Sequence, residues 1–547
     1  MPNRVSLLRR AAVALSVVFV LAHGWTSVGQ DRAPRLVVLL VVDQLRADYV
    51  DKLQHQWTSG LHRLVAEGAW FRQAEYPYFN AATCAGHASV STGTTPAIHG
   101  MILNQWWDRD SQSSVACADD ASVKIISYGN PVAVAGESAA RLLAPTLADE
   151  LRAQLSPAAR VIAFSLKARS AVTLGGQHPD AVAWFADQRA WVTSTAFSPG
   201  PVPEVADFIS HHPVEQDFGK VWDRTLPKNV YLYEDPAVGI IGGPEVTTGF
   251  PHIVRNYAHW QSSPYADEYL AQMALDVATR MRLGAAGRTD MIAIGFSTLD
   301  FVGHSYGPNS HEIQDVLIRL DRALGGFFAG VDRLVGSGNY VVALTGDHGV
   351  APVPERARLF GLDSGRVPGL AIVSAGEQAA VRALGRGKYV SRLELPDLYF
   401  EPGVYDKLRR QPSALESVRD AIKSVTGVTT TYTRDEIEQG RFGEDAVGRQ
   451  IANGHLAARS GDITVVLRPY WMTAPAGTTH GTGYSYDTRV PLLMMGKGIR
   501  RGEYLAPASP LDIAPTLAFL AGITLPRAQG RILTDALNTA RSVPPNN

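Results

Sequence analysis

Several short runs of apolar residues along the chain are rich in valine, isoleucine and leucine and do not alternate with polar residues. Continuous apolar runs of this length are typical of strands that are buried on both faces of a sheet. The predicted strands span residues 36–42, 160–164, 291–296, 340–344 and 491–495.

Longer stretches between these runs carry apolar residues three or four positions apart, which is the period of an amphipathic helix. In 267–283 one helix face holds Tyr269, Met273 and Val277, and 311–335 repeats the pattern. Strands that alternate with helices indicate an α/β fold with a largely parallel central sheet flanked by helices.

Two stretches interrupt this alternation. Residues 197–264 are rich in proline and glycine, and residues 351–479 have a mixed pattern. Although 547 residues exceed the usual size of one domain, we interpret 30–547 as a single α/β domain with these stretches as insertions. Because loops of α/β enzymes carry specificity, the insertions are expected to form a cap over the active site.

The N-terminus has the layout of a secretory signal peptide. Arg4, Arg9 and Arg10 precede the apolar run 11–22, and small residues follow. About 20 apolar residues are needed to cross a bilayer, so this run is short for a membrane span, although an uncleaved anchor remains an alternative. We predict cleavage of residues 1–29 and a periplasmic or secreted protein without a stable membrane anchor.

Composition narrows the possible functions further. The formal net charge is -1 and 19% of the residues are charged, which is ordinary for a globular protein and predicts no specific nucleic-acid partner. The only cysteines are Cys84 and Cys117. An oxidising compartment would allow them to pair, but a free structural thiol is equally compatible with the sequence.

Polar residues follow four of the predicted strands. Asp43, Lys167, Asp300 and the Asp347-His348 pair each stand just beyond an apolar run. In open α/β sheets, ligands bind at the carboxyl ends of the strands. These side chains are therefore candidates for one common site.

The same residues include donors that bind metal ions. Asp300 and His304 are four residues apart and would share one face of a helix. His480 lies in a loop of small residues. Together with Asp43, Asp347 and His348 these side chains offer three carboxylates and three imidazoles, a set that suits two zinc ions with open positions for a substrate.

Thr83 is the candidate nucleophile. It lies in the segment Thr83-Cys-Ala-Gly-His87, which is expected to open a helix. A threonine at this position is most often a helix cap. Its hydroxyl would become a usable nucleophile only next to a metal ion. We assign His87 a structural role.

With these motifs the chain resembles the alkaline phosphatase superfamily, and within it the phosphate-irrepressible alkaline phosphatases that use a threonine nucleophile. The resemblance rests on Asp43-Gln-Leu-Arg46, Thr83-Cys-Ala-Gly-His87 and Ser509-Pro-Leu-Asp512, in this order. It implies a zinc-dependent enzyme that hydrolyses phosphate monoesters through a phosphothreonine at Thr83.

The resemblance also implies a role for each candidate. Asp512 corresponds to a structural residue near the last helix. Trp106 and Trp107 lie near Asn104 in the sequence, which leaves them as either pocket walls or core residues. One zinc would be held by Asp300, His304 and His480, and the other by Asp43, Thr83, Asp347 and His348. Substrate phosphate oxygens would be bound by Asn104, Lys167 and Arg169.

Other functions fit less well. A nucleotide pyrophosphatase/phosphodiesterase of the same superfamily is the main alternative, but it usually lacks the Lys-x-Arg pair. Residues 84–88 do not match the formylglycine motif of sulfatases, and cytoplasmic phosphomutases conflict with the signal peptide. A binding protein that has lost catalysis would lack the nucleophile or the phosphate-binding residues, and both are present.

Overall fold

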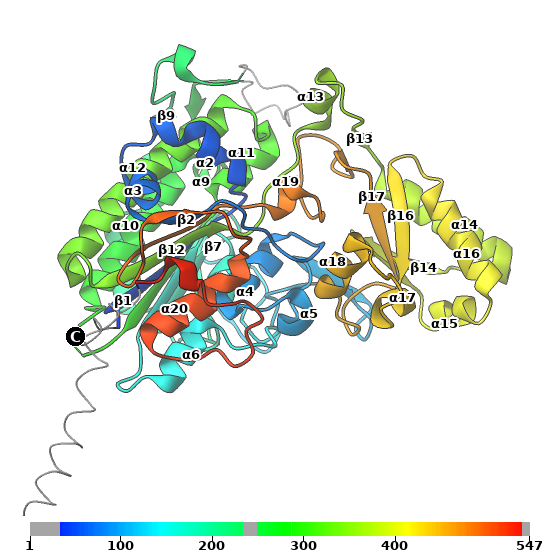
Figure 1. Ribbon diagram of the computed structural model, residues 1–547, viewed down its shortest axis with the longest axis horizontal. Coiled ribbons are helices and arrows are strands. Elements are labelled where there is room, and N and C mark those ends of the chain that lie inside the picture. The colour runs from blue at the N-terminus through cyan, green and yellow to red at the C-terminus, as the bar shows by residue number, and fades with distance from the viewer. Residues whose placement is uncertain (1–32, 234–248, 286, 539–547) are drawn as a thin grey trace, which may run out of the picture.

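The computed structural model describes residues 33–233, 249–285 and 287–538, so the predicted signal peptide lies outside the described residues. Its main sheet has ten strands in the order β20-β2-β19-β12-β1-β11-β6-β7-β8-β5 (Figure 1). In chain order these strands are β1 (Leu36–Val42), β2 (Ala69–Phe71), β5 (Ile125–Ser127), β6 (Val161–Ser165), β7 (Ala181–Ala186), β8 (Ala190–Ser194), β11 (Asp290–Phe296), β12 (Tyr340–Gly346), β19 (Leu492–Gly496) and β20 (Gly502–Tyr504).

The centre of this sheet is parallel. Strand β1 pairs in parallel with β11 and β12, and β6 continues the parallel arrangement from β11 to β7. Strand β19 is antiparallel to β12. An apolar run indicates that a strand is buried but does not indicate its direction in the sheet. The sequence therefore predicts the position of β19 but not that it is antiparallel to β12. The predicted α/β class with a largely parallel, helix-flanked sheet is confirmed.

Strand β1 shows why its apolar run is unbroken. Its alternate side chains enter two different hydrophobic cores, with Leu36, Val38, Leu40 and Val42 in one and Val37, Leu39 and Val41 in the other. The first core also receives α10 (Pro264–Arg280) and α12 (His311–Val335). The second receives α4 (Thr83–Thr92), α7 (Ala168–Gly175) and α20 (Ile513–Ala521). Both faces of the sheet are therefore covered.

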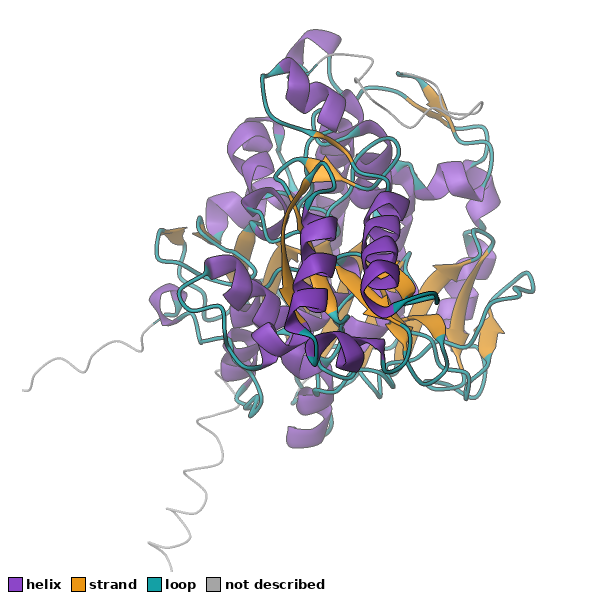
Figure 2. Ribbon diagram, turned by 90° about the vertical axis from the view of Figure 1, so that its right-hand side faces the viewer, coloured by secondary structure: helices purple, strands orange, loops and turns teal. Residues whose placement is uncertain are grey.

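A smaller sheet lies inside the stretch 351–479. It consists of β14 (Val390–Glu394), β15 (Asp397–Phe400), β16 (Val428–Thr433) and β17 (Ile463–Leu467), and its pairs are antiparallel. Helices α14 (Gly369–Leu384) and α16 (Pro412–Lys423) pack on it and share its separate hydrophobic core. Figure 2 looks onto this part and shows its helices in front of its strands.

A hairpin joins the smaller sheet to the rest of the molecule. Its strands are β3 (Gln105–Asp108) and β4 (Ser113–Ala116). The side chains of Gln105 and Ser114 donate hydrogen bonds to the two carboxylate oxygens of Glu394, at 2.9 and 2.8 Å. This contact fixes one edge of the insertion beside the segment that contains Asn104.

In the part of 197–264 that the structure describes, the α-helices and strands are short. They are α8 (Pro203–His211), β9 (Val221–Trp222), β10 (His252–Ile253) and α9 (Tyr257–Gln261). The remaining elements are α2 (Ala47–Leu53), α3 (Gly60–Glu67), α5 (Pro96–His99), α6 (Leu147–Gln154), α11 (Thr298–Tyr306), α13 (Pro354–Leu359), α15 (Val404–Arg409), α17 (Arg434–Glu438), α18 (Ala446–Gly454), α19 (Ser485–Thr488), β13 (Gly365–Arg366) and β18 (Trp471–Met472).

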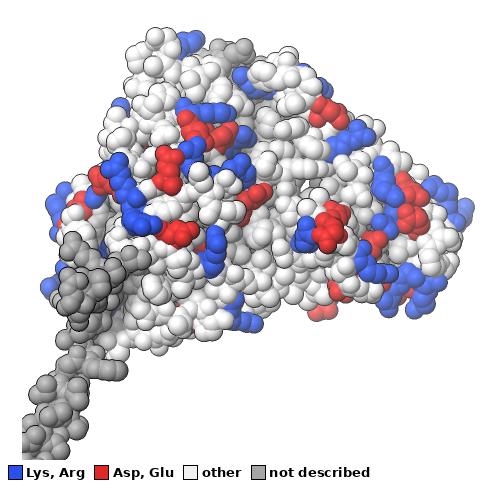
Figure 3. Space-filling view, in the orientation of Figure 1, with Lys and Arg blue, Asp and Glu red and all other residues white. Residues whose placement is uncertain are grey.

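Surface charges are mixed in sign. Figure 3 shows lysine and arginine side chains interspersed with aspartate and glutamate over the face in view, without one large patch of either sign. Within the described ranges, no helix combines the length and the apolar character that crossing a membrane requires.

Candidate active site

The candidate site forms where the central parallel strands end. Val42, the last residue of β1, lies in register with Phe296 of β11 and Gly346 of β12. Parallel strands in register bring the residues that follow them to the same edge of the sheet. Asp43 and the Asp347-His348 pair therefore meet there, together with Asp300 at the start of α11.

One group of candidate metal ligands surrounds the imidazole of His348. Its Nε2 atom lies 3.4 Å from Asp43 Oδ1 and 3.3 Å from Asp347 Oδ2. Both oxygens are buried and have no hydrogen-bond donor among the described residues. Leaving buried carboxylate oxygens unpaired is costly, whereas a bound cation would satisfy them. These three residues thus have the chemistry and spacing of a metal site.

The second group surrounds Asp300. Its Oδ1 atom lies 3.1 Å from His304 Nε2 and 3.9 Å from His480 Nε2. The rings of His348 and His480 are stacked with their centroids 3.4 Å apart. Consequently Asp300, His348 and His480 also form a set whose ligand atoms lie within 4.8 Å of one another. The two groups are adjacent, and His348 stands between them.

All three histidines present the same nitrogen to the site. In each ring Nδ1 faces a backbone carbonyl, which can only accept, so Nδ1 carries a proton and Nε2 is the nitrogen that faces the site. His304 Nδ1 lies 2.8 Å from the Thr478 carbonyl oxygen. His348 Nδ1 lies 2.9 Å from that of Gly349, and His480 Nδ1 lies 2.9 Å from that of Ala81. Metal-binding histidines are oriented in this way.

Burial and charge set the protonation of the group. Burial lowers the pKa of His348 to about 4 and that of His480 well below its ordinary value, so both rings stay neutral, as ligands must be. Burial and the Asp43 carboxylate raise the pKa of Asp347 well above its ordinary value. Burial alone would also raise the pKa of Asp300, but His304 and Lys167 outweigh it and lower that pKa.

Thr83 is the first residue of α4, and its hydroxyl does not cap the helix. Ala82 occupies the capping position, and no side chain accepts a hydrogen bond there. Instead the Thr83 hydroxyl lies 3.4 Å from His348 Nε2 and is almost fully buried. His87, one turn later, donates from Nδ1 to the Thr83 carbonyl at 2.9 Å. Burial lowers the pKa of His87 to about 4, so it is a neutral, helix-internal donor.

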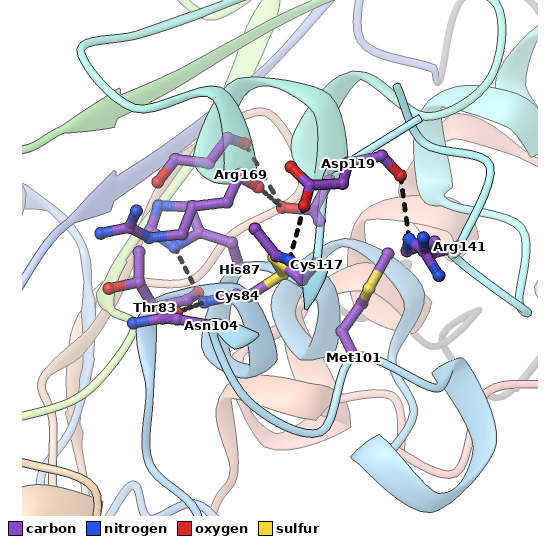
Figure 4. The surroundings of a disulfide bond; sticks show 12 residues. Thr83, Cys84, His87, Met101, Asn104, Cys117, Asp119, Arg141 and Arg169 are labelled. Atoms are coloured by element: carbon purple, nitrogen blue, oxygen red, sulfur yellow. Dashed lines mark hydrogen bonds between the residues drawn. A yellow bond between two sulfur atoms is a disulfide. The ribbon is translucent and has the colours of Figure 1, made fainter. Parts of the chain in front are cut away.

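The structure answers the open question about the cysteines, because Cys84 and Cys117 form a disulfide. Figure 4 shows this bond beside Thr83, with Asn104 and Arg169 on the same side. The backbone N–H of Cys84 donates to Asn104 Oδ1 at 2.8 Å. Asn104 is therefore held next to the candidate nucleophile.

Lys167 joins the two ligand groups. Its ammonium lies 2.5 Å from Asp43 Oδ2 and 2.5 Å from Asp300 Oδ2, and all three side chains are buried. Arg169, two residues on, has a buried Nε without a hydrogen-bond partner in the described part of the chain. Lys167 and Arg169 also line a cavity of about 560 Å³, together with Trp184 and Phe301.

Three further residues can now be placed. Trp106 is buried in a small apolar core with Cys84 and Cys117, which decides in favour of a core role. Asp512 accepts from the backbone N–H groups of Ser509 and Arg531 and so has a structural role. Gln44 contacts two of the candidate ligands but was not predicted as a site residue. Its sequence signal is its place in Asp43-Gln-Leu-Arg46, two residues after the end of a buried strand.

Comparison with known proteins defines the class. The sequence matches the family described as type I phosphodiesterase / nucleotide pyrophosphatase over residues 37–485, and the chain belongs to this family. The predicted resemblance to the alkaline phosphatase superfamily, which includes this family, is confirmed.

Individual relatives define the similarity more narrowly than the family does. Alkaline phosphatase PhoV of Synechococcus elongatus is 30% identical over 92% of this chain and 93% of its own length. Alkaline phosphatase PafA of Elizabethkingia meningoseptica is 31% identical over 92% and 94%. A crystal structure of PafA superposes with a TM-score of 0.86 at 29% identity, covering 92% of this chain and 99% of the other. Murine ectonucleotide pyrophosphatase / phosphodiesterase 5 shares the fold, with a TM-score of 0.52 at 15% identity.

Proposed function

We propose that this chain is a zinc-dependent alkaline phosphatase that hydrolyses phosphate monoesters through a covalent phosphothreonine at Thr83. The observation that carries the proposal is the position of the Thr83 hydroxyl, which faces His348 Nε2 at 3.4 Å instead of capping α4. The relatives named alkaline phosphatases support the same reaction.

The donor set supports two zinc ions. Neutral imidazoles and carboxylates are the ligands that zinc prefers outside thiolate sites. We assign Asp300, His304 and His480 to one ion and Asp43, Thr83, Asp347 and His348 to the other. When bound, the ions would lower the pKa of the Thr83 hydroxyl and stabilise the oxygen of the leaving alcohol.

The chain's own groups then carry out the reaction. Thr83 Oγ1 attacks phosphorus in line with the departing alcohol, the bond from phosphorus to that alcohol breaks, and Thr83 becomes phosphorylated. Water attacks the phosphothreonine from the opposite side, releases phosphate and returns Thr83 to its starting state. Asn104, Lys167 and Arg169 bind the nonbridging oxygens and stabilise their charge in both steps.

A specific feature favours monoesters over the diesters of nucleotide pyrophosphatases. A monoester dianion carries more charge on its nonbridging oxygens than a diester, and Lys167 with Arg169 supplies two cations for it. A solved variant of PafA has a threonine, an asparagine, a lysine and an arginine replaced together. These are the residue types that we assign to the nucleophile and the phosphate site here.

Replacing Thr83 tests the nucleophile. We expect Thr83→Ala to lose at least about 10³-fold in kcat for an aryl phosphate, because activation of a covalent nucleophile is removed. Thr83→Ser keeps a hydroxyl and serves as the control, with activity well above that of the alanine variant. After acid quenching, mass spectrometry should find phosphate at position 83 in the wild type and in Thr83→Ser but not in Thr83→Ala. An alanine variant as fast as the wild type would refute the assignment.

Replacing the two cations tests the substrate class. We expect Lys167→Ala with Arg169→Ala to reduce kcat/KM for an aryl phosphate monoester at least about tenfold more than for the matching methyl diester, since charge-assisted hydrogen bonds to the extra charge are lost. Equal losses on the two substrates would favour the phosphodiesterase alternative. Zinc content, measured on the same samples, shows whether the metal sites survive.

Other properties remain predictions from sequence. They are export to the periplasm or the medium, the absence of a membrane anchor and of a specific nucleic-acid partner, and the arrangement of 30–547 as one domain with insertions at 197–264 and 351–479. Comparing the N-terminal residue of the secreted protein with residue 30 would test the first of them.

A further inference from the structure

Gln44 directly follows Asp43 and touches one carboxylate from each ligand group. Its backbone N–H donates to Asp347 Oδ1 at 2.9 Å. Its side-chain amide donates from Nε2 to Asp300 Oδ1 at 2.7 Å. Gln44 is buried, so both hydrogen bonds are shielded from water. One residue thus orients two carboxylates, one in α11 and one just after β12.

The backbone at Gln44 is unusual for its residue type. Its φ angle is 66°, in the left-handed region that residues other than glycine, asparagine and aspartate seldom adopt. A glycine here would be free of this strain but would have no side chain to reach Asp300. The strained conformation is consistent with a requirement for both the backbone and the amide contact.

Gly303 provides the space for the Gln44 side chain. It lies in α11 between Asp300 and His304, and a β-carbon at this position would stand 1.8 Å from Gln44 Oε1. Glycine is unfavourable inside a helix, and Gly303 does not have the positive φ angle that would require it. Close approach of the Gln44 amide accounts for its presence.

We propose that Gln44 is a positioning residue that holds one carboxylate of each metal group in its ligating orientation. The inference rests on the metal-dependent function proposed above. A donor to one carboxylate oxygen fixes the plane of the group. In Asp347 the engaged oxygen is Oδ1, and Oδ2 is left facing His348. In Asp300 the engaged oxygen is Oδ1 itself, the one that faces His304, and Lys167 holds Oδ2. Partners of this kind typically contribute 10- to 100-fold to metal affinity.

The two contacts make separable predictions. Gln44→Met has nearly the length of glutamine and keeps the backbone N–H, but it has no side-chain donor. We therefore expect zinc at the Asp300 group to bind 10- to 100-fold more weakly, with a much smaller change at the Asp347 group. Titration of the metal-free protein against a chromophoric chelator measures both affinities. Cobalt(II) absorption spectra report the coordination at each site without reliance on activity.

Gly303 supplies the matched control. Gly303→Ala should reproduce the loss of zinc affinity while Gln44 remains in place, because the added methyl group displaces the amide. In a Gln44→Gly background the same substitution meets no amide and should cost no further affinity. If the effects of Gln44→Gly and Gly303→Ala are simply additive, the two residues do not act through this contact and the proposal is overturned.

One more variant separates failure of this proposal from failure of the proposed function. Asp300→Ala removes the ligand itself and should abolish zinc binding at that group. If Asp300→Ala still binds two zinc ions with wild-type affinity, the metal assignment is wrong. If Asp300→Ala loses zinc but Gln44→Met binds it as tightly as the wild type, the metal site stands and the positioning role of Gln44 is refuted.

Discussion

At the scale of single residues, the disulfide positions the side-chain amide of Asn104, which we propose binds phosphate. The backbone N–H of Cys84 donates to Asn104 Oδ1 at 2.8 Å. The backbone N–H of Cys117 donates to the Asn104 backbone carbonyl at 2.9 Å. Because Oδ1 already accepts a hydrogen bond, the Nδ2 group of Asn104 remains as a donor for a substrate oxygen. The Cys84–Cys117 bond therefore fixes Asn104 relative to Thr83.

Removal of the disulfide should weaken phosphate binding. For Cys84→Ser with Cys117→Ser we expect kcat/KM for a monoester to fall about 5- to 20-fold, the equivalent of about 1–2 kcal/mol for one misplaced hydrogen bond. Inhibition by inorganic phosphate should weaken in parallel. Asn104→Ala, tested with and without the disulfide, is the control. The losses should be less than additive, and full additivity would show that the disulfide does not act through Asn104.

Residues with their own motif could be predicted, and residues that support them could not. Asp300 and His304 are four apart, and the resemblance indicated Asn104 and Lys167. Gln44 forms no motif with its partner Asp300, which lies 256 residues away in the sequence. Only the parallel register of β1 with β11 brings the two together.

At the scale of elements, α10 anchors the start of α11. Asp267 of α10 accepts from the backbone N–H groups of Ser297 and Thr298, at 3.2 and 3.4 Å, just before Asp300. Its other carboxylate oxygen is buried without a partner among the described residues. Burial raises the pKa of Asp267 to about 7. The folded chain therefore binds this proton more tightly than the unfolded chain does.

Stability should consequently depend on pH through Asp267. An unfolded aspartate has a pKa of about 3.9, so the contribution is full below about pH 4 and is lost as the pH rises toward about 7. Asp267→Asn keeps an acceptor oxygen and has no charge. Between pH 5 and 7 the wild type should lose about 2 kcal/mol relative to this variant in urea unfolding. Parallel pH profiles for the two proteins would contradict the raised pKa.

The accuracy of element prediction followed the strength of the apolar pattern. The prediction 36–42 matches β1, and 311–335 matches α12. The smaller sheet was missed because its outer strands expose part of each face. In β16, for example, Val428 and Thr431 are buried whereas Thr429 is exposed. Such strands lack both a continuous apolar run and a regular alternation.

At the scale of the whole molecule, the candidate site gathers buried carboxylates that lie far apart in the sequence. The carboxylates of Asp43, Asp300 and Asp347 are buried together, and Lys167 pairs with only the first two of them. The candidate ligands, from residue 43 to residue 480, converge only in the folded chain, so the metal ions that we propose would bind the folded state preferentially and stabilise it.

Metal removal should therefore lower the thermal stability of the entire protein. At a free zinc concentration of about 1,000 times Kd, binding contributes about 4 kcal/mol, which for a chain of this length corresponds to a decrease in Tm of about 4 °C after chelation. Scanning fluorimetry with a chelator, and then with added zinc, measures the decrease and its reversal. Asp43→Asn with Asp347→Asn removes two of the carboxylates that we assign to bound zinc, so the chelator should have a smaller effect. An unchanged Tm in wild-type protein shown to be free of metal would mean that these carboxylates are not held by bound ions.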